Sequence, residues 1–115
     1  MRASSGVRGR DEVIRIPVIL GIDVPRPLFL SPKIHITPGA RDAIAEAGED
    51  PRELLDRHFC GDWGDLDPED AAKNDAAVPA KDRVLSLYRT TTGRRIYVIT
   101  DPGHETTTIL LREEY

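Results

Sequence analysis

Residues able to support chemistry gather at positions 58 to 62, where His58, Cys60 and Asp62 stand close together. Histidine, cysteine and aspartate are ligands of transition metals, and an imidazole beside a thiol can activate a cysteine nucleophile. On a helix, however, side chains two positions apart point to different sides. We therefore expect His58 to be a structural histidine bonded to nearby backbone and Cys60 to pack beside Phe59, with a catalytic cysteine as the alternative.

The segment that follows is dense in carboxylates. They are Asp62, Asp65, Asp67, Glu69 and Asp70. Oxygen ligands at this density suit a hard cation such as Ca²⁺ or Mg²⁺. An EF-hand loop counted from Asp62 would need glycine and glutamate where this chain has Asp67 and Lys73. Helix capping and the first helical turn explain Asp67 and Asp70 without a ligand, so we predict neither a metal site nor a cofactor.

Trp63, the only tryptophan of the chain, lies between Asp62 and Gly64. An exposed aromatic side chain with acidic neighbours would be a contact point for a partner. The alternative is that Trp63 fills the core between the second and third predicted helices, because Gly61 and Gly64 permit a tight backbone there. We favour the architectural role.

A second group of chemically capable residues lies in the last third of the chain. It comprises Tyr88, Arg89, Arg94, Arg95, Tyr97 and His104. Such side chains can hold phosphate and transfer protons, as in metal-free ribonucleases. Helices followed by a β-meander are similar in order to the small ribonuclease toxins of the RelE type, which is an analogy of fold alone. The alternative is that these charges protect strand ends from aggregation.

The chain has 115 residues, 39% of them hydrophobic and 31% charged, which fits one soluble domain. Its net charge of −4 argues against direct binding of nucleic acid or anionic membrane as the main role, although a local basic patch stays open. A lone Cys60 cannot form an intramolecular disulfide, and no apolar run has the length of a signal peptide or membrane span. We expect a cytoplasmic protein.

Three predicted helices begin with the same device, a capping oxygen followed by proline: Thr37-Pro38, Asp50-Pro51 and Asp67-Pro68. The first is expected over residues 38–47, the second ends before Gly61, and the third reaches residue 79 at most. A brief strand at 34–36 precedes the first helix. Residues 1–12 are predicted to form a flexible arm and residues 13–115 a single domain, which begins with an edge strand or irregular segment over 13–30.

From residue 84 the pattern alternates, which predicts strands at 84–90, 95–100 and 106–111 joined by short turns. The predicted fold class is therefore α+β, with a short N-terminal strand, two to three helices and a three-stranded antiparallel β-meander. Both faces of the meander carry apolar residues, so the helices would cover one face and a partner the other. Candidates for the buried face are Leu85, Leu87, Tyr97, Ile99, Ile109 and Leu111.

Several motifs stand out together. They are Ile36-Thr37-Pro38-Gly39-Ala40, Arg57-His58, Gly61-Asp62-Trp63-Gly64-Asp65-Leu66, Asn74-Asp75 and the closing residues 107–115. In these the chain resembles, over residues 33–115, a family of small bacterial proteins of plasmids, prophages and integrative elements that are labelled plasmid-related proteins. The resemblance implies an accessory protein of a mobile genetic element in the bacterial cytoplasm, and no activity or site comes with it.

The expected function is a non-enzymatic protein-interaction module. Its acidic surface would bind a basic bacterial protein, for example one that itself handles DNA. The residues that form or support this surface are Asp62, Trp63, Asp65, Asp70, Asn74 and Asp75. The enzymatic alternative is a small metal-free ribonuclease or toxin that uses Arg94, Arg95, His104 and Tyr97 on the meander.

Overall fold

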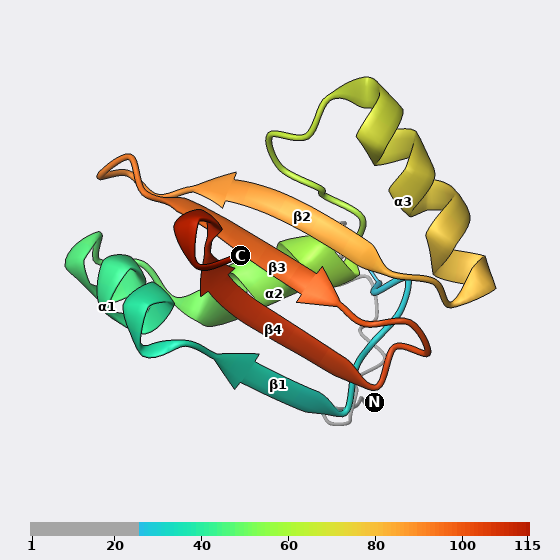
Figure 1. The fold of residues 1–115 in the computed structure, drawn as a ribbon, viewed down its shortest axis with the longest axis horizontal. Coiled ribbons are helices and arrows are strands. Elements are labelled where there is room, and N and C mark those ends of the chain that lie inside the picture. Colours follow the sequence, from blue (N-terminus) through green and yellow to red (C-terminus); the bar gives the residue numbers. More distant parts are fainter. Residues whose placement is uncertain (1–25) are drawn as a thin grey trace, which may run out of the picture.

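The computed structural model describes residues 26–115, so the expectations for residues 1–25, including the arm at 1–12, lie outside the described residues. Along the described part, one strand is followed by three α-helices and then by three further strands, as Figure 1 shows. The elements are β1 (Lys33–Ile36), α1 (Pro38–Glu46), α2 (Pro51–Phe59), α3 (Pro68–Ala80), β2 (Val84–Arg89), β3 (Arg95–Thr100), β4 (Thr106–Leu111) and a 3₁₀ helix, η1 (Arg112–Glu114). The predicted α+β class is confirmed.

The four strands of the described part form one mixed sheet in the order β1-β4-β3-β2. β2, β3 and β4 are antiparallel neighbours, as the predicted meander requires. β1 instead pairs with β4 in parallel, which sets Ile36 opposite Ile109. A parallel pair needs a long crossover connection, and here the crossover contains the helices and the first two strands of the meander.

Each helix begins at its predicted proline because the preceding residue caps it. Thr37 Oγ1 accepts a hydrogen bond from Ala40 N–H at 3.1 Å, and Asp67 Oδ1 accepts one from Asp70 N–H at 2.9 Å. An aspartate cap begins α2 in the same way. α3 runs one residue past its predicted limit and ends where Lys81 adopts a left-handed φ of 56°.

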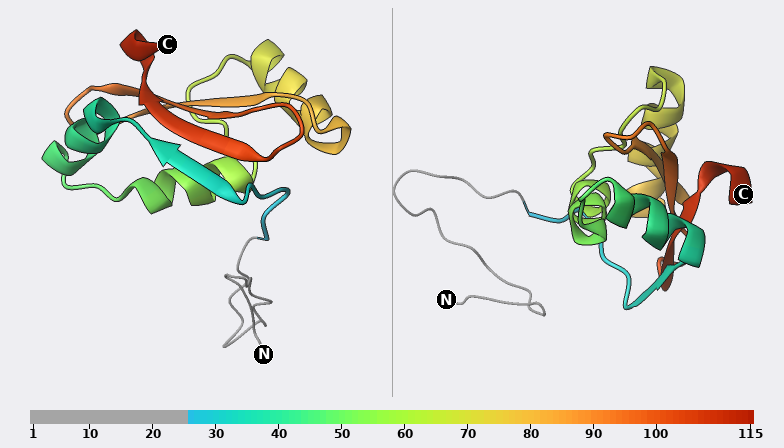
Figure 2. Two further views of the ribbon diagram at one scale, coloured as in Figure 1. Left: turned by 60° about the horizontal axis from the view of Figure 1, so that its bottom comes forward. Right: turned by 90° about the vertical axis from the view of Figure 1, so that its left-hand side faces the viewer.

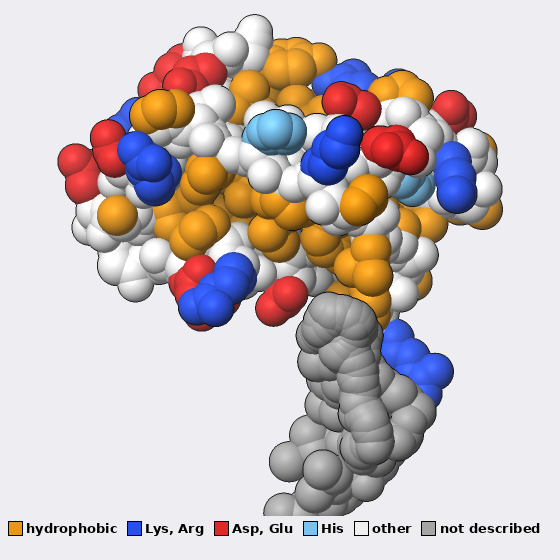
Figure 3. All heavy atoms as spheres, turned by 90° about the horizontal axis from the view of Figure 1, so that it is seen from below, with side chains coloured by type: hydrophobic (Ala, Val, Ile, Leu, Met, Phe, Trp, Pro, Cys, Tyr) orange, Lys and Arg blue, Asp and Glu red, His pale blue; other side chains and the backbone are white. Residues whose placement is uncertain are grey.

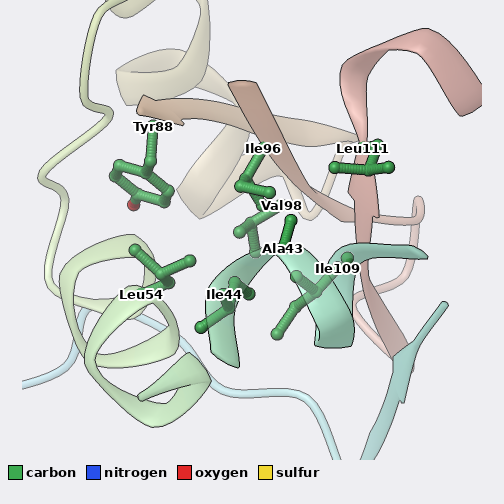
Figure 4. Close-up of a cluster of buried hydrophobic side chains, with 9 residues drawn as sticks. Ala43, Ile44, Leu54, Tyr88, Ile96, Val98, Ile109 and Leu111 are labelled. Atoms are coloured by element: carbon green, nitrogen blue, oxygen red, sulfur yellow. The ribbon is translucent and has the colours of Figure 1, made fainter. Parts of the chain in front are cut away.

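The helices lie on one side and at one edge of the sheet. α1 and α2 cover one face, and α3 lies beside β2 (Figures 1 and 2). Side chains from α1, α2 and the meander meet in the main core, shown in Figure 4. Its buried members are Ala40, Ala43, Ile44, Leu54, Tyr88, Ile96, Val98, Ile109 and Leu111. This core fixes α2, and with it the start of the acidic segment, against the sheet.

The prediction of the buried face was wrong in part. Ile109 and Leu111 are on the covered face as expected, together with Val84, Ser86, Tyr88, Ile96 and Val98. The open face instead carries Leu85, Leu87 and Tyr97, all half-buried, and Ile99, which is buried. The physical reason is that the covered face also takes three hydroxyl residues, so counting apolar side chains selects the wrong face. Those three are Ser86, Thr100 and Thr107.

Apolar side chains are exposed beside β1. Seen from below, they form a connected area between charged side chains (Figure 3). Large apolar residues exposed near β1 are Leu28, Leu30 and Ile34. Within residues 26–115, no helix has both the length and the apolar character needed to cross a bilayer.

Candidate functional site

The acidic segment is attached to the outer edge of β2 through its backbone. Asp65 N–H donates to Leu87 C=O at 2.7 Å, and Leu87 N–H donates to Trp63 C=O at 3.1 Å. These bonds flank a short parallel bridge between Gly64 and Leu87. One residue of the edge strand is thereby paired as it would be inside a sheet.

A side chain of α3 closes the next position of the same edge. Asn74 Nδ2 donates to Leu85 C=O at 2.7 Å, and Asn74 Oδ1 accepts from Leu85 N–H at 3.2 Å. The amide thus occupies the place of a neighbouring strand. We call Trp63, Gly64, Asp65 and Asn74 the edge clamp, since together they satisfy backbone groups that would otherwise invite another strand.

Gly64 allows the clamp to lie this close to β2. Its φ is 76°, and a Cβ at this position would stand 2.0 Å from the Leu87 carbonyl oxygen. A side chain is therefore excluded on two grounds, the left-handed backbone and the backbone contact. The close contact with β2 therefore requires glycine at position 64, directly before Asp65.

Trp63 is buried, with 6% of its surface exposed, and packs with Ala77 and Val84. Its indole Nε1–H donates to Asp75 Oδ1 at 2.9 Å, which satisfies the one polar atom of the ring. The architectural interpretation of Trp63 is confirmed by this burial. Trp63 and Asn74 therefore support the acidic surface from beneath, and Asp75 accepts the hydrogen bond of the Trp63 indole.

Asp62 is held by Arg57 at the end of α2. The Asp62 carboxylate accepts from Arg57 Nε at 2.6 Å and from Gly64 N–H at 3.1 Å, and the guanidinium lowers the pKa of this carboxyl. Arg57 also lies over the ring of Tyr88, at 4.4 Å from its centroid, while the Tyr88 hydroxyl donates to the Asp62 carbonyl at 2.7 Å. Asp62 therefore anchors the segment and offers a charge that is already partly compensated.

The remaining carboxylates face solvent. Asp65, Glu69, Asp70 and Asp75 are exposed, and Asp70 lies 3.7 Å from Lys73. Lys73 is the only basic residue between positions 62 and 75. We call Asp62, Asp65, Asp70 and Asp75, with Trp63 and Asn74 beneath them, the acidic surface.

His58 lies in the core and not in a cleft. Its Nδ1 is 2.6 Å from Ser86 Oγ and its Nε2 is 2.9 Å from Thr100 Oγ1. Thr100 Oγ1 in turn lies 2.7 Å from Thr107 Oγ1. Burial lowers the pKa of His58 to about 3, with the charge of His104 as a smaller cause. His58 is structural as predicted, but its partners are side-chain hydroxyls and not the backbone.

Cys60 has no imidazole to activate it, since both ring nitrogens of His58 are taken by hydroxyls. Burial raises the pKa of the Cys60 thiol, which keeps the sulfur protonated at neutral pH. The position behaves as a half-buried packing residue at the end of α2.

A hollow of about 600 Å³ lies where the β2–β3 turn meets η1. It is lined by Gly93, Arg94, Arg95, Tyr97, Arg112, Glu113 and Tyr115, and we call it the basic hollow. The structure thus brings together Arg94, Arg95 and Tyr97 from the predicted ribonuclease group and adds Arg112 and Tyr115, which the sequence reasoning missed.

His104 does not belong to the basic hollow. It sits in the β3–β4 turn, so the length of β3 separates it from the arginines at the β2–β3 turn. His104 is buried, and its Nε2 lies 2.8 Å from the Asp82 carbonyl oxygen. The proton-transferring histidine that a ribonuclease of this kind would use is therefore not brought to the cationic residues.

Within residues 26–115, no group of three histidine, cysteine, aspartate or glutamate side chains is placed to hold a metal ion. Comparison of the chain with protein-family models, with curated proteins and with solved structures found no match.

Proposed function

We propose that this chain is a non-enzymatic interaction module whose acidic surface binds a basic protein. The carrying observation is that Asp65 and Asp70 are exposed on a segment whose backbone is fixed to β2 by the edge clamp. A surface that is already ordered loses little conformational freedom on binding. A concentrated negative charge also accelerates the approach of a positively charged partner.

The positions and contacts of the other chemically capable residues support a role without catalysis. The ring nitrogens of His58 are used inside the core, and the thiol of Cys60 is held in its protonated form. His104 stands away from Arg94 and Arg95. The groups that bind and move protons in a ribonuclease are thus dispersed, which favours the interaction module over the enzymatic alternative.

The proposal also specifies the chemistry of the partner. Carboxylates recognise lysine and arginine side chains, and basic proteins of bacteria include those that handle DNA. The resemblance to plasmid-related proteins adds the setting of a mobile genetic element in the bacterial cytoplasm. In that setting the acidic surface would recruit or inhibit a DNA-handling protein.

Charge reversal tests the proposal. The variant Asp65→Lys/Asp70→Lys changes two exposed side chains that lie outside the core, so the chain should still fold. A matched control is Asp42→Lys/Glu46→Lys, which makes the same change of net charge on the exposed side of α1. Loss of a bound partner in the first variant alone supports the proposal, whereas equal binding by both variants contradicts it.

A further inference from the structure

Within residues 26–115 the sheet contains no acidic residue, although the chain has 20 of them. The strands β1 to β4 hold no aspartate or glutamate, and the charged residues they do hold are Lys33, Arg89 and Arg95. In the described part of the chain, α1 and α2 cover one face of this sheet (Figure 2). Arg95 and Tyr97, which line the basic hollow, alternate with the covered residues Ile96 and Val98 and so lie on the other face. The geometry points to a second binding site, in which the basic hollow and the adjoining open face bind single-stranded nucleic acid.

Two arginines that form no ion pair with any residue of the described part lie at one end of the open face and support this assignment. Arg89 and Arg95 are directly opposite each other on β2 and β3, and both are exposed. Like charges directly opposite on neighbouring strands destabilise a sheet. An anion placed between the two guanidiniums would remove that repulsion, and Arg95 lines the basic hollow.

The other arginines of the hollow are oriented by neighbouring side chains. Arg112 Nε donates to the Tyr97 hydroxyl at 3.4 Å, and this bond does not use the two terminal nitrogens of the guanidinium. Arg94 donates to Glu113 at 3.1 Å and is therefore already paired. Arg95 and Arg112 are thus the residues that offer planar donor pairs, and phosphate oxygens match such pairs closely.

Two aromatic rings meet at the same place. The rings of Tyr97 and Tyr115 lie edge to face, with centroids 5.5 Å apart and planes at 84°. Tyr115 is 67% exposed, and Arg83 lies over its ring. Rings held beside arginines are the platforms on which unpaired bases stack.

These features together select the ligand. An acidic peptide would use the arginines but would gain nothing specific from the two tyrosine rings, and a duplex would hide its bases from them. A single strand uses both the guanidiniums and the rings. The local basic patch left open by the net charge therefore has a definite location.

The test is the fluorescence anisotropy of labelled oligo(dT) and oligo(U) strands of about 15 nucleotides, titrated with the full chain at about 50 mM salt. Arg95→Glu removes the central charge and places a carboxylate opposite Arg89, so the sheet should stay folded. Tyr97→Leu removes a ring and keeps an apolar side chain at a half-buried position. Arg41→Glu, on α1, is the control for net charge.

We expect both oligonucleotides to bind wild-type protein and the Arg41→Glu control, and binding to weaken about fivefold or more in Tyr97→Leu. Arg95→Glu should weaken binding further and reduce its dependence on salt. Preference for one oligonucleotide would identify RNA or DNA as the ligand. Absence of binding to both, or equal binding by wild type and Arg95→Glu, would overturn the inference. The inference would also be overturned if polyglutamate displaced the bound oligonucleotides and Tyr97→Leu bound them as tightly as wild type.

Discussion

The side-chain amide of Asn74 pairs with both backbone groups of Leu85, donating to its C=O at 2.7 Å and accepting from its N–H at 3.2 Å. One side chain thereby performs the role of a strand at the edge of a sheet. Asn74 is itself buried, so water cannot replace these bonds easily. The helix that follows the acidic segment is fastened to the sheet at this point.

Replacing Asn74 by aspartate should destabilise the fold. The change keeps the size of the side chain but sets a carboxylate oxygen against the Leu85 carbonyl and removes a donor. We expect a loss of about 1–3 kcal/mol in the free energy of unfolding. Urea unfolding followed by the fluorescence of Trp63 measures it, because this buried ring is the only tryptophan. Asp75→Asn is the control, since its amide oxygen can still accept from Trp63; an equal loss in both variants would refute the role of Asn74.

Gly64→Ala should cost more than alanine at another glycine with positive φ. Gly64 and Gly48 have φ values of 76° and 70°, so alanine suffers a similar backbone strain of about 1–2 kcal/mol at both. Only at position 64 does the new Cβ also collide with the Leu87 carbonyl, since nothing lies within 4 Å of it at Gly48. Thermal unfolding of the two variants isolates the contact. Equal melting temperatures would show that the clamp tolerates separation from β2.

Burial of neutral His58 predicts a stability that depends on pH. The folded pKa of about 3 lies below the ordinary value of 6.5. Above pH 6.5 the ring is neutral in both states, so its contribution is fully present. As pH falls from 6.5 toward 3, the unfolded chain binds a proton that the folded chain does not, and the free energy of unfolding decreases by about 1.4 kcal/mol per pH unit.

The measurement is urea unfolding between pH 6.5 and 4.5, above the range in which most carboxylates titrate. His58→Gln should lower stability at every pH and should flatten the slope in this range. His35→Gln, which changes an exposed histidine on β1, should leave the slope as in the wild type. A slope unchanged by His58→Gln would mean that another group causes the acid sensitivity.

Local signals in the sequence predicted the local structure well. The Thr-Pro and Asp-Pro pairs give the helix starts because capping and the fixed φ of proline depend on neighbouring residues alone. The short turn predicted between the last two strands is also present, and in it His104 N–H donates to Asp101 C=O at 2.9 Å. Such features need no knowledge of the tertiary structure.

Features that depend on tertiary pairing could not be predicted from local sequence patterns. The parallel pairing of β1 with β4 joins residues more than 70 positions apart, and no local pattern encodes it. The covered face was assigned wrongly for β2 and β3, because Ser86 and Thr100 take part in the core as hydrogen-bond partners of His58. The sequence contained one indication of the role of Asn74, because this polar residue stands on the same helical face as Ala71 and Ala77.

The acidic surface itself was named from residue types, and the structure separates its members by what they do. Trp63 and Asn74 hold the segment, whereas Asp65 and Asp70 present charge to solvent. Substitutions in the first pair would test stability, and substitutions in the second pair test binding. This separation makes the proposed function open to a direct experiment.

That experiment is affinity capture of the tagged chain from its host's lysate, run side by side with Asp65→Lys/Asp70→Lys and with Asp42→Lys/Glu46→Lys. Captured proteins are identified by mass spectrometry, and thermal unfolding verifies that all three chains are folded. We expect a basic protein that wild type and the α1 control retain and that Asp65→Lys/Asp70→Lys loses. Retention of the same proteins by all three folded chains would contradict the claim that the acidic surface is an interaction site.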